Sequence, residues 1–239
     1  MKTVFISDLH LAREPNSNSE IFLRLLANLD RDTDALYILG DLFEAWLGDD
    51  DTSPLYETII ATLKHVHDCG IPVYLMHGNR DFLLGDAFCQ QTGCQLLSDP
   101  TVINLYGTPT LLMHGDLLCI DDLEYQAYRQ QVRGEQFQSK VLQKPLWVRR
   151  LIARFLRWRS RWHNRRASLE IMDANQQAVF EAMQQHHVRV MIHGHTHRPA
   201  IELRWHGKHR YTRYVLSDWE GYGNKLEVNG EHWQLRNFR

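Results

Sequence analysis

Short apolar runs rich in β-branched residues recur along the chain, and polar residues and glycine bound each of them. Such runs predict buried strands. The predicted strands are Thr3–Ser7, Ala35–Leu39, Ile71–Met76, Thr110–Met113 and Val188–Ile192. Segments of helical length separate several of them, namely Asn18–Leu29, Pro54–Asp68 and Phe82–Gln91. This alternation predicts an α/β core with helices outside the sheets.

The pattern changes in two other parts of the chain. After Pro199, shorter and more polar strand-like runs predict an antiparallel finish at Ala200–Trp205, Arg210–Leu216, Lys225–Val228 and His232–Arg236. From about residue 121 to residue 170, the pattern is helical without a convincing strand. Because motif-bearing strands lie on both sides of this segment, we predict a helical cap inserted into a single domain that spans residues 1–239.

Composition narrows the class of protein. The 239 residues are 44% hydrophobic, enough for a sizeable core, and the formal net charge of −2 argues against a general nucleic-acid binder. The four cysteines form no CxxC pair, which favours a reduced, cytosolic compartment. No segment reaches the roughly 18 apolar residues that span a bilayer. We expect a protein that is soluble or attached to a membrane surface.

Polar clusters directly follow the five predicted strands. They are Asp8-Leu9-His10, Gly40-Asp41, His77-Gly78-Asn79-Arg80-Asp81, His114-Gly115-Asp116 and His193-Gly194-His195-Thr196-His197. In open α/β sheets, ligands bind outside the carboxyl ends of strands. Each cluster alone is weak, since Gly-Asp after a strand is usually a turn. All five together, in order, point to a single functional site.

The residue types in these clusters indicate a catalytic metal centre. Carboxylates, imidazoles and an amide oxygen, without thiolate, suit divalent manganese, iron or zinc. The clusters supply seven candidate ligands. They are too many for one tetrahedral ion, and they suit two ions about 3.5–4 Å apart. Asp41, in the middle of the set, is the best candidate for a bridge.

The ordered motifs resemble the calcineurin-like metallophosphoesterase superfamily. The resemblance implies an αββα sandwich, a four-layer fold in which two mixed sheets pack face to face between helices. It also implies two divalent ions, preferably Mn²⁺. One ion would be held by Asp8, His10, Asp41 and His197, and the other by Asp41, Asn79, His114 and His195. Asp81 and Asp116 are candidates for orienting metal-bound groups.

Arg80 departs from the His that many members of the superfamily carry at this position. Arg does not protonate a leaving group, because its pKa is above about 12, but it pairs with phosphate oxygens. Arg80 therefore favours a diphosphate bond, whose leaving group needs little protonation. The segments Ala35–Asp51, Tyr74–Gly85, Leu112–Leu118 and Ile192–Ala200 resemble the branch that cleaves UDP-2,3-diacylglucosamine in lipid A biosynthesis.

That branch implies a reaction and a set of substrate contacts. A metal-bridging hydroxide held by Asp41 would attack the uridine-side phosphorus while Arg80 neutralises charge, giving UMP and 2,3-diacylglucosamine 1-phosphate (lipid X). The substrate-binding residues would be Asn79, Arg80, Asp122, Ser160, Asn164 and His195. Asp122 also has the sequence context of a helix N-cap. Ala167 stands where related enzymes carry Lys, and this difference removes one charged contact.

The predicted cap carries eight arginines and no acidic residue between Pro145 and Leu169. Beside them, a stripe of aromatic and aliphatic residues runs from Trp147 to Trp162 at helical spacing. This pattern favours acyl-chain contact and an anionic membrane surface. An ordinary cap helix with a solvated basic face remains an alternative. The acidic run Asp49–Asp51 is interpreted as a solvated loop.

These observations predict a monomer on the cytoplasmic side of the inner membrane, bound to a lipid-linked sugar nucleotide and not to nucleic acid. One rival function is a dinucleoside polyphosphate hydrolase or nucleotide phosphodiesterase of the same superfamily. Another is a metal-free interaction scaffold, against which the complete set of ligand-type residues argues.

Overall fold

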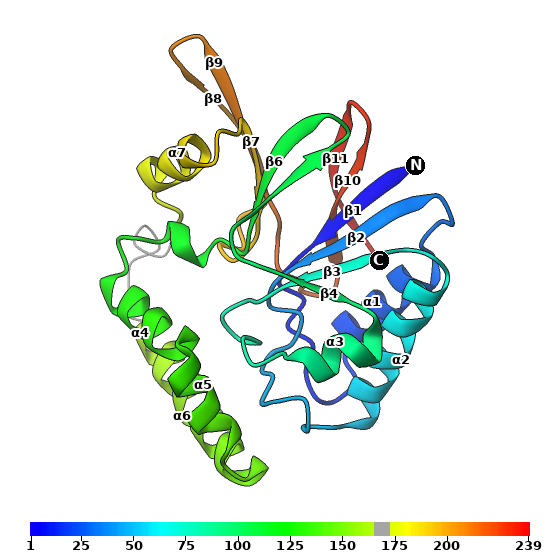
Figure 1. The fold of residues 1–239 in the computed structure, drawn as a ribbon, viewed down its shortest axis with the longest axis vertical. Coiled ribbons are helices and arrows are strands. Elements are labelled where there is room, and N and C mark those ends of the chain that lie inside the picture. Colours follow the sequence, from blue (N-terminus) through cyan, green and yellow to red (C-terminus); the bar gives the residue numbers. More distant parts are fainter. Residues whose placement is uncertain (165–172) are drawn as a thin grey trace.

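Two mixed β-sheets lie face to face at the centre of the molecule (Figure 1). The computed structural model describes residues 1–164 and 173–239, and the side chains of all of these except residues 159–164. The six-stranded sheet has the order β11-β10-β1-β2-β3-β4, and the five-stranded sheet has the order β5-β6-β7-β9-β8. The strands are β1 Lys2–Ile6, β2 Thr33–Leu39, β3 Val73–Met76, β4 Gln95–Leu97, β5 Thr101–Leu105, β6 Thr108–Met113, β7 Val190–His193, β8 Ala200–His206, β9 His209–Val215, β10 Gly223–Asn229 and β11 His232–Phe238.

Parallel strands form the centre of each sheet, and antiparallel strands extend it. β1, β2, β3 and β4 are parallel neighbours, as are β6, β7 and β9. The hairpin of β10 and β11 joins β1, and β8 and β5 close the second sheet, in antiparallel pairing. The late antiparallel strands are therefore confirmed, but they complete both sheets instead of forming one unit.

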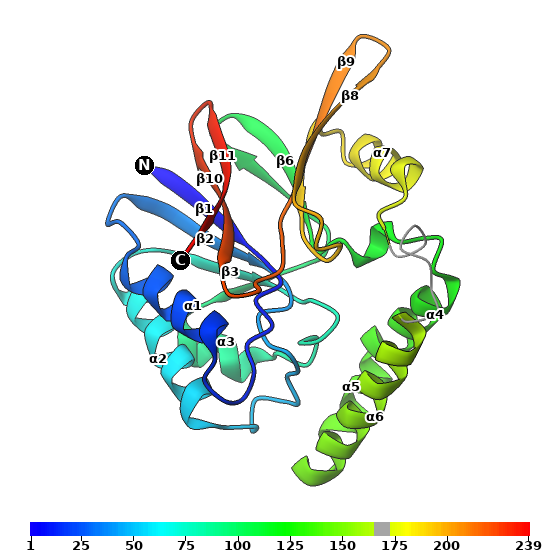
Figure 2. The same ribbon diagram turned by 180° about the vertical axis from the view of Figure 1, so that it is seen from behind.

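Seven α-helices and one 3₁₀ helix are described, and some of them cover the outer faces of the sheets. They are α1 Ser17–Ala27, α2 Pro54–Asp68, α3 Asp86–Thr92, α4 Leu123–Arg133, α5 Glu135–Leu142, α6 Leu146–Asn164 and α7 Gln176–Gln185, with a short 3₁₀ helix at Asp116–Leu118. α1, α2 and α3 lie against the six-stranded sheet, and α7 lies beside the other sheet (Figures 1 and 2). The four-layer sandwich that the resemblance implied is confirmed.

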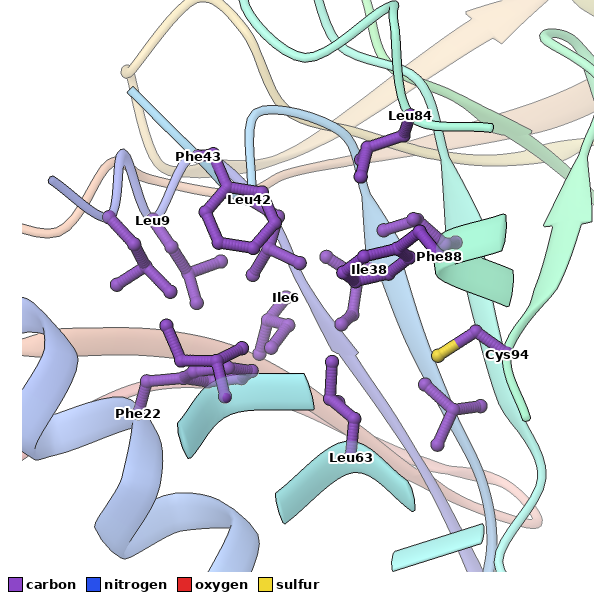
Figure 3. Close-up of a cluster of buried hydrophobic side chains, with 14 of the residues drawn as sticks. Ile6, Leu9, Phe22, Ile38, Leu42, Phe43, Leu63, Leu84, Phe88 and Cys94 are labelled. Atoms are coloured by element: carbon purple, nitrogen blue, oxygen red, sulfur yellow. The ribbon is translucent and has the colours of Figure 1, made fainter. Parts of the chain in front are cut away.

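The layers follow from strands that are apolar on both faces. In β1, Val4 and Ile6 belong to the core under α1 and α2, which Figure 3 shows around Phe22 and Leu63. The intervening Phe5 packs between the two sheets. Because successive side chains of a strand point to opposite faces, one continuous apolar run supplies both cores.

Two expectations about local structure were wrong. The helix expected over Phe82–Gln91 begins only at Asp86, because Phe82–Leu84 form a buried loop segment and Gly85 is the N-cap. The strands β4 and β5 were not predicted.

The interval expected to form the cap holds α4, α5 and α6, which lie together away from the sheets (Figure 1). Residues 165–170 of that interval lie outside the described part of the chain, and the division into one domain with an insertion stays a prediction. None of the helices described here combines the length and the apolarity needed to cross a bilayer.

Candidate metal centre and substrate cleft

The predicted ligands gather where the strands of both sheets end. They follow five strands, each parallel to a neighbour in its sheet. Asp8 and His10 follow β1, Asp41 follows β2, Asn79 follows β3, His114 follows β6, and His195 and His197 follow β7. The side chains come within hydrogen-bonding range although 187 positions separate His10 from His197, whose Nε2 atoms lie 3.3 Å apart. The fold thus assembles the site from distant parts of the sequence.

Several of these residues have left-handed backbone. Among the described residues, seven other than glycine have positive φ, and five of the seven are predicted ligands, namely Asp8, His10, Asp41, His195 and His197. This conformation is uncommon for residues with a Cβ atom and is concentrated at functional sites. It turns the chain sharply at the strand end, so that the side chain points back across the edge of the sheet.

Two glycines permit the close approach of neighbouring loops. A Cβ atom on Gly78 would lie 2.0 Å from Asp41 Oδ1, and one on Gly194 would lie 2.1 Å from Asp8 Oδ2. Distances this short exclude any side chain. The Gly-Asn-Arg-Asp and Gly-His-Thr-His motifs therefore need glycine so that the buried carboxylates can fit against the backbone.

One group of donors consists of Asp8, His10 and His197, whose ligand atoms lie within 4.8 Å of one another. Asp8 Oδ2 accepts hydrogen bonds from the Ser7 hydroxyl and from the backbone N–H of His195 at 2.9 Å. Its other oxygen, Oδ1, is 3.4 Å from His197 Nε2. The carboxylate is thus held by one oxygen and presents the other to the imidazoles.

The second group centres on His114. His114 Nδ1 lies 2.9 Å from the carbonyl oxygen of Leu39, which makes this nitrogen the donor and leaves Nε2 as the ligand atom. Asn79 Oδ1 is 3.1 Å from His114 Nε2 and 3.1 Å from His195 Nδ1. An amide oxygen and two imidazole nitrogens therefore converge from three strands.

Asp41 lies between the two groups. Its Oδ2 is 3.7 Å from His10 Nδ1, and its Oδ1 is 4.0 Å from His114 Nε2. A backbone N–H from Arg80 holds Oδ1 at 2.9 Å. By ligand spacing Asp8 also groups with Asp41 and His114. Asp41 is favoured as the bridge because its two oxygens face different ligand groups, and this assignment stays a prediction.

The donor set fits divalent metal ions. Asp8 Oδ1 and His10 Nδ1 are buried without a hydrogen-bond partner in the described structure. Buried polar atoms normally have hydrogen-bond partners. Two unpartnered ligand-type atoms are therefore consistent with a site where a metal ion binds them. Oxygen and imidazole donors without thiolate suit Mn²⁺, Fe²⁺ or Zn²⁺.

The protonation of the imidazoles divides them into two classes. Burial, together with the charge of Arg80, lowers the pKa of His10 to about 3, and burial beside His114 lowers that of His195 to about 3. Burial also lowers the pKa of His197, but the neighbouring carboxylates of Asp218 and Asp8 outweigh it and raise this pKa to about 10. For His114, nearby carboxylates outweigh burial and raise the pKa to about 9.

Metal binding should therefore release protons. At neutral pH, His114 and His197 are protonated without metal because their pKa values are raised to about 9 and about 10, and ligation requires the neutral form. We expect about two protons per loaded centre from these imidazoles and a further fraction from Asp41, whose pKa burial raises to about 7, and tighter metal binding as the pH rises. Calorimetric titration with Mn²⁺ in buffers of different ionisation enthalpy measures this number. Asp218→Asn should reduce it by about one, and release of no protons would contradict the assignment.

Asp218 is a site residue that the sequence analysis missed. Its Oδ2 lies 3.3 Å from His197 Nδ1, which leaves Nε2 of that ring for the metal side. A carboxylate in this place fixes the tautomer and orientation of a ligating imidazole. The available signal was its position directly after β9, the same position that identified the other clusters after their strands.

Arg80 points into the site beside a second missed residue, Glu44. Its Nη1 donates to Glu44 Oε2 at 2.6 Å, and its Nε lies 3.6 Å from Asp41 Oδ2. The side chain remains 35% exposed, so it is available to a ligand.

Asp81 and Asp116 bind groups other than the predicted ligands. Asp81 accepts backbone N–H groups from Gly78 at 2.8 Å and Leu42 at 2.7 Å, and so ties two ligand loops together. Asp116 accepts the Tyr125 hydroxyl at 2.8 Å and Arg129 Nε at 2.8 Å. Asp81 therefore positions the loops, and Asp116 connects α4 to the centre.

The predicted substrate contacts of the cap are only partly described. Asp122 is the N-cap of α4, where its Oδ1 accepts the N–H of Tyr125 at 3.0 Å. The N-cap interpretation of Asp122 is thus confirmed, and a role in substrate binding stays a prediction. Ser160 and Asn164 lie in α6, and their side chains are outside the described part of the structure, as is Ala167 entirely.

A cleft of about 710 Å³ runs from the metal centre to the underside of the cap. Its polar lining includes Glu44, Asn79 and Arg80 beside the metal ligands. Its apolar lining comes from the loops after β2 and β3 and from α4, α5 and α6, with Trp46, Phe82, Leu83, Tyr128, Phe137, Val141, Ile152 and Leu156. The cap also contributes Glu124, Arg149, Arg154 and Arg157 to the lining, so the cleft combines charged groups with a large apolar surface.

The aromatic stripe of α6 was expected to form the acyl-binding side, but most of its described residues do not line the cleft. Trp147, Leu151 and Phe155 are 65%, 55% and 59% exposed and line no part of the cleft. Ile152 and Leu156, one position further along, face it instead. Of the described stripe, Trp158 alone lines the cleft and is also exposed.

The acidic run Asp49–Asp51 is not a solvated loop. Asp50 pairs with Arg149, which is buried, and Asp51 pairs with Arg150 at 3.0 Å and with Arg13. These ion pairs join the first turn of α6 to the sandwich. Two of the eight cap arginines are therefore bound to carboxylates and do not belong to a free basic face.

Comparisons with known proteins agree with this geometry. The sequence profile of the family described as calcineurin-like phosphoesterase matches residues 1–199. Relatives named UDP-2,3-diacylglucosamine hydrolase, from Escherichia coli O7:K1 (strain IAI39 / ExPEC) and Escherichia fergusonii, are each 48% identical over 238 residues, covering 100% of this chain and 99% of the relative. A solved archaeal phosphodiesterase aligns with a TM-score of 0.49 at 12% identity over 100% of this chain and 99% of that chain, which is too distant to support an argument.

Proposed function

Because this chain belongs to the calcineurin-like phosphoesterase family, we propose that it hydrolyses the diphosphate bond of UDP-2,3-diacylglucosamine, releasing UMP and 2,3-diacylglucosamine 1-phosphate in lipid A biosynthesis. The observation that carries the proposal is a single cleft that joins Asn79 and Arg80 at the ligand groups to a large apolar surface under the cap, which also carries cap arginines. The 48% identity to relatives that bear the name of this activity supports the same substrate.

The ligand groups would hold two divalent ions, and we propose Mn²⁺. Asp8, His10, Asp41 and His197 would bind one ion, and Asp41, Asn79, His114 and His195 would bind the other. When bound, two such ions polarise the phosphoryl oxygens and activate water.

The polar end of the cleft suits the diphosphate. Arg80 presents a guanidinium beside Asp41, and Asn79 presents an amide. A guanidinium stabilises the charge that develops on phosphoryl oxygens. Water attacks the uridine-side phosphorus, and the bond from that phosphorus to the bridging oxygen breaks. The leaving group is a phosphate, so the absence of a proton donor at position 80 is no obstacle.

The apolar part of the cleft suits acyl chains. Ile152 and Leu156 of α6 face Phe82 and Leu83 of the sandwich across the space that the cap covers. Transferring an acyl chain from water into such surroundings contributes about 0.8 kcal/mol per CH₂ group. A nucleotide alone would leave this surface unfilled, which favours the lipid substrate over the dinucleotide rival.

Product analysis tests the function directly. Purified protein is incubated with UDP-2,3-diacylglucosamine in detergent, with Mn²⁺ or with chelator, and the products are identified by mass spectrometry. Metal-dependent release of UMP and the diacylated sugar phosphate supports the proposal. Equal turnover of de-acylated UDP-glucosamine, or faster turnover of a dinucleoside polyphosphate, would favour the nucleotide-hydrolase alternative.

Two leucines of α6 offer a matched test of the acyl site. Leu156 lines the cleft, whereas Leu151 is 55% exposed on the outer stripe. Leu156→Ala should raise KM on the order of tenfold, since two or three methylene equivalents of contact are lost at about 0.8 kcal/mol each. Leu151→Ala should leave KM in detergent unchanged. Equal KM values for the two variants in steady-state kinetics would place the acyl chains elsewhere.

We also propose that the protein is a monomer attached to the cytoplasmic side of the inner membrane. The exposed side chains of Trp147, Leu151, Phe155 and Trp158 form an apolar stripe along α6, next to the cationic Arg154. Aromatic and basic residues on one helix suit an interface with anionic lipid. Such attachment would bring the cleft to a substrate that resides in the bilayer.

A further inference from the structure

The hairpin formed by β8 and β9 projects beyond the rest of the five-stranded sheet, at the opposite end of the molecule from α6 (Figures 1 and 2). β8 is the edge strand, paired only with β9. Neither the metal centre nor the cleft uses a residue of this hairpin. An edge hairpin of this length needs a physical explanation for the residues that it exposes.

One face of the hairpin is apolar and exposed. Ile201, Leu203 and Trp205 alternate along β8, so their side chains share a face, and they are 49%, 57% and 70% exposed. Near the base, Tyr214 lies opposite Ile201 on the same face and stacks on Trp233 of the other sheet at 4.9 Å. Near Tyr214, this face of the hairpin is covered by the other sheet. Towards the tip, the hairpin extends past that sheet and the same face is exposed.

The tip of the hairpin is basic. Residues 203–210 contain Arg204, Lys208 and Arg210 and no acidic residue. The one carboxylate of β8, on Glu202, binds Arg213 at 2.6 Å near the base and lies 4.0 Å from Arg204. Positive charge at the tip therefore exceeds negative charge, directly beside Trp205.

Contacts on the other face support the hairpin. The ring of Phe180 from α7 lies 4.2 Å from the ring of His206 and 5.2 Å from that of Tyr211. The helix thus covers the side of the hairpin opposite Ile201, Leu203 and Trp205. α7 therefore supports the hairpin from one side and leaves the apolar face on the other side exposed.

We propose that this hairpin is a lipid-docking surface for an anionic bilayer, separate from α6. Its Trp205 and Leu203 would enter the interfacial region while Arg204, Lys208 and Arg210 meet the head groups. Tryptophan beside cationic side chains matches the polarity of that region, and each Lys or Arg near an anionic surface adds to the attraction. Because the hairpin lies at the opposite end of the molecule from α6, it would meet a bilayer in an orientation of its own, and the inference does not rest on the proposed function.

Charge favours the bilayer over a second copy of the chain. The same segment of a second copy, residues 203–210, carries three cationic side chains and no carboxylate to neutralise them. An anionic surface has the opposite sign. It also accommodates isolated apolar side chains such as Ile201 without requiring a complementary pocket.

Vesicle binding in the absence of substrate tests the inference. Full-length protein is sedimented with vesicles of one part phosphatidylglycerol to two parts phosphatidylcholine, or with phosphatidylcholine alone. The charge variant R204Q/K208Q/R210Q should bind the anionic vesicles at least roughly tenfold more weakly at low salt, and the difference should shrink in high salt. The apolar variant I201S/L203S/W205S should lose a similar factor. The control variant L96S/V102S removes apolar residues of similar exposure on β4 and β5 and should bind as the wild type does.

Several results would overturn the inference. Unchanged vesicle binding by the charge variant, which alters only exposed residues, would leave α6 as the sole lipid contact. A wild-type dimer that becomes a monomer in I201S/L203S/W205S, measured by light scattering, would assign the face to a second copy. Turnover in detergent should be the same for all variants. Failure of the wild type to hydrolyse the lipid substrate would refute the proposed function and leave the vesicle result unaffected.

Discussion

Asp41→Asn is expected to lower kcat by at least about 10³-fold, since losing the metals removes several kcal/mol of transition-state stabilisation and about 1.4 kcal/mol corresponds to tenfold. Its two oxygens face His10 at 3.7 Å and His114 at 4.0 Å, so one substitution affects both ligand groups. The measurement is steady-state turnover together with metal content of the purified variant. Wild-type turnover with normal metal content would contradict the bridge.

The fold should tolerate this substitution. Burial raises the pKa of Asp41 to about 7, which means that its carboxylate is destabilising in the metal-free protein above its unfolded pKa. A neutral Asn of the same shape removes that cost and keeps an acceptor for the N–H of Arg80. The metal-free melting temperature should therefore be unchanged or higher, while the increase that Mn²⁺ gives the wild type should disappear. A lower metal-free melting temperature would show a structural role instead.

The sequence predicted the strands that are buried on both faces and the antiparallel strands after Pro199, and it missed β4 and β5. β2 and β7 are continuous apolar runs because a core lies on each side of them. β5 alternates exposed and partly buried residues at one edge of its sheet, and β4 has only three residues, two of them exposed. Short edge strands carry little apolar signal, and their pairing depends on the neighbouring strand.

The sequence identified the residues that gather at the candidate metal centre, but it missed several of the residues that position them. Ligands follow strands as short motifs, and the chemistry of metal binding restricts their types. Glu44 and Arg129 contact the site through distances that only the folded chain defines. The cap shows the same limit. Periodicity identified an amphipathic α6, but it did not show that Ile152 faces the cleft or that Arg149 is buried against Asp50.

Arg80→Ala should lower kcat by about 10²- to 10³-fold, the cost of removing one donor that acts on transition-state charge. The guanidinium lies in the polar end of the cleft, where it is 35% exposed and paired with Glu44 at 2.6 Å. Arg80→Lys should recover only part of the rate, because an ammonium lacks the planar fork that binds two phosphate oxygens. Pre-steady-state and steady-state kinetics with the lipid substrate measure both variants.

Arg154 supplies the matched control for this result. It also lines the cleft and is exposed, but it lies on α6 and forms no part of the ligand groups, so Arg154→Ala should leave kcat nearly unchanged. Metal content and melting temperature of Arg80→Ala should equal those of the wild type, since the backbone N–H of residue 80 still binds Asp41. Loss of metal or of several degrees in melting temperature would make Arg80 a structural residue. In that case its presence would no longer favour a diphosphate bond over a phosphomonoester.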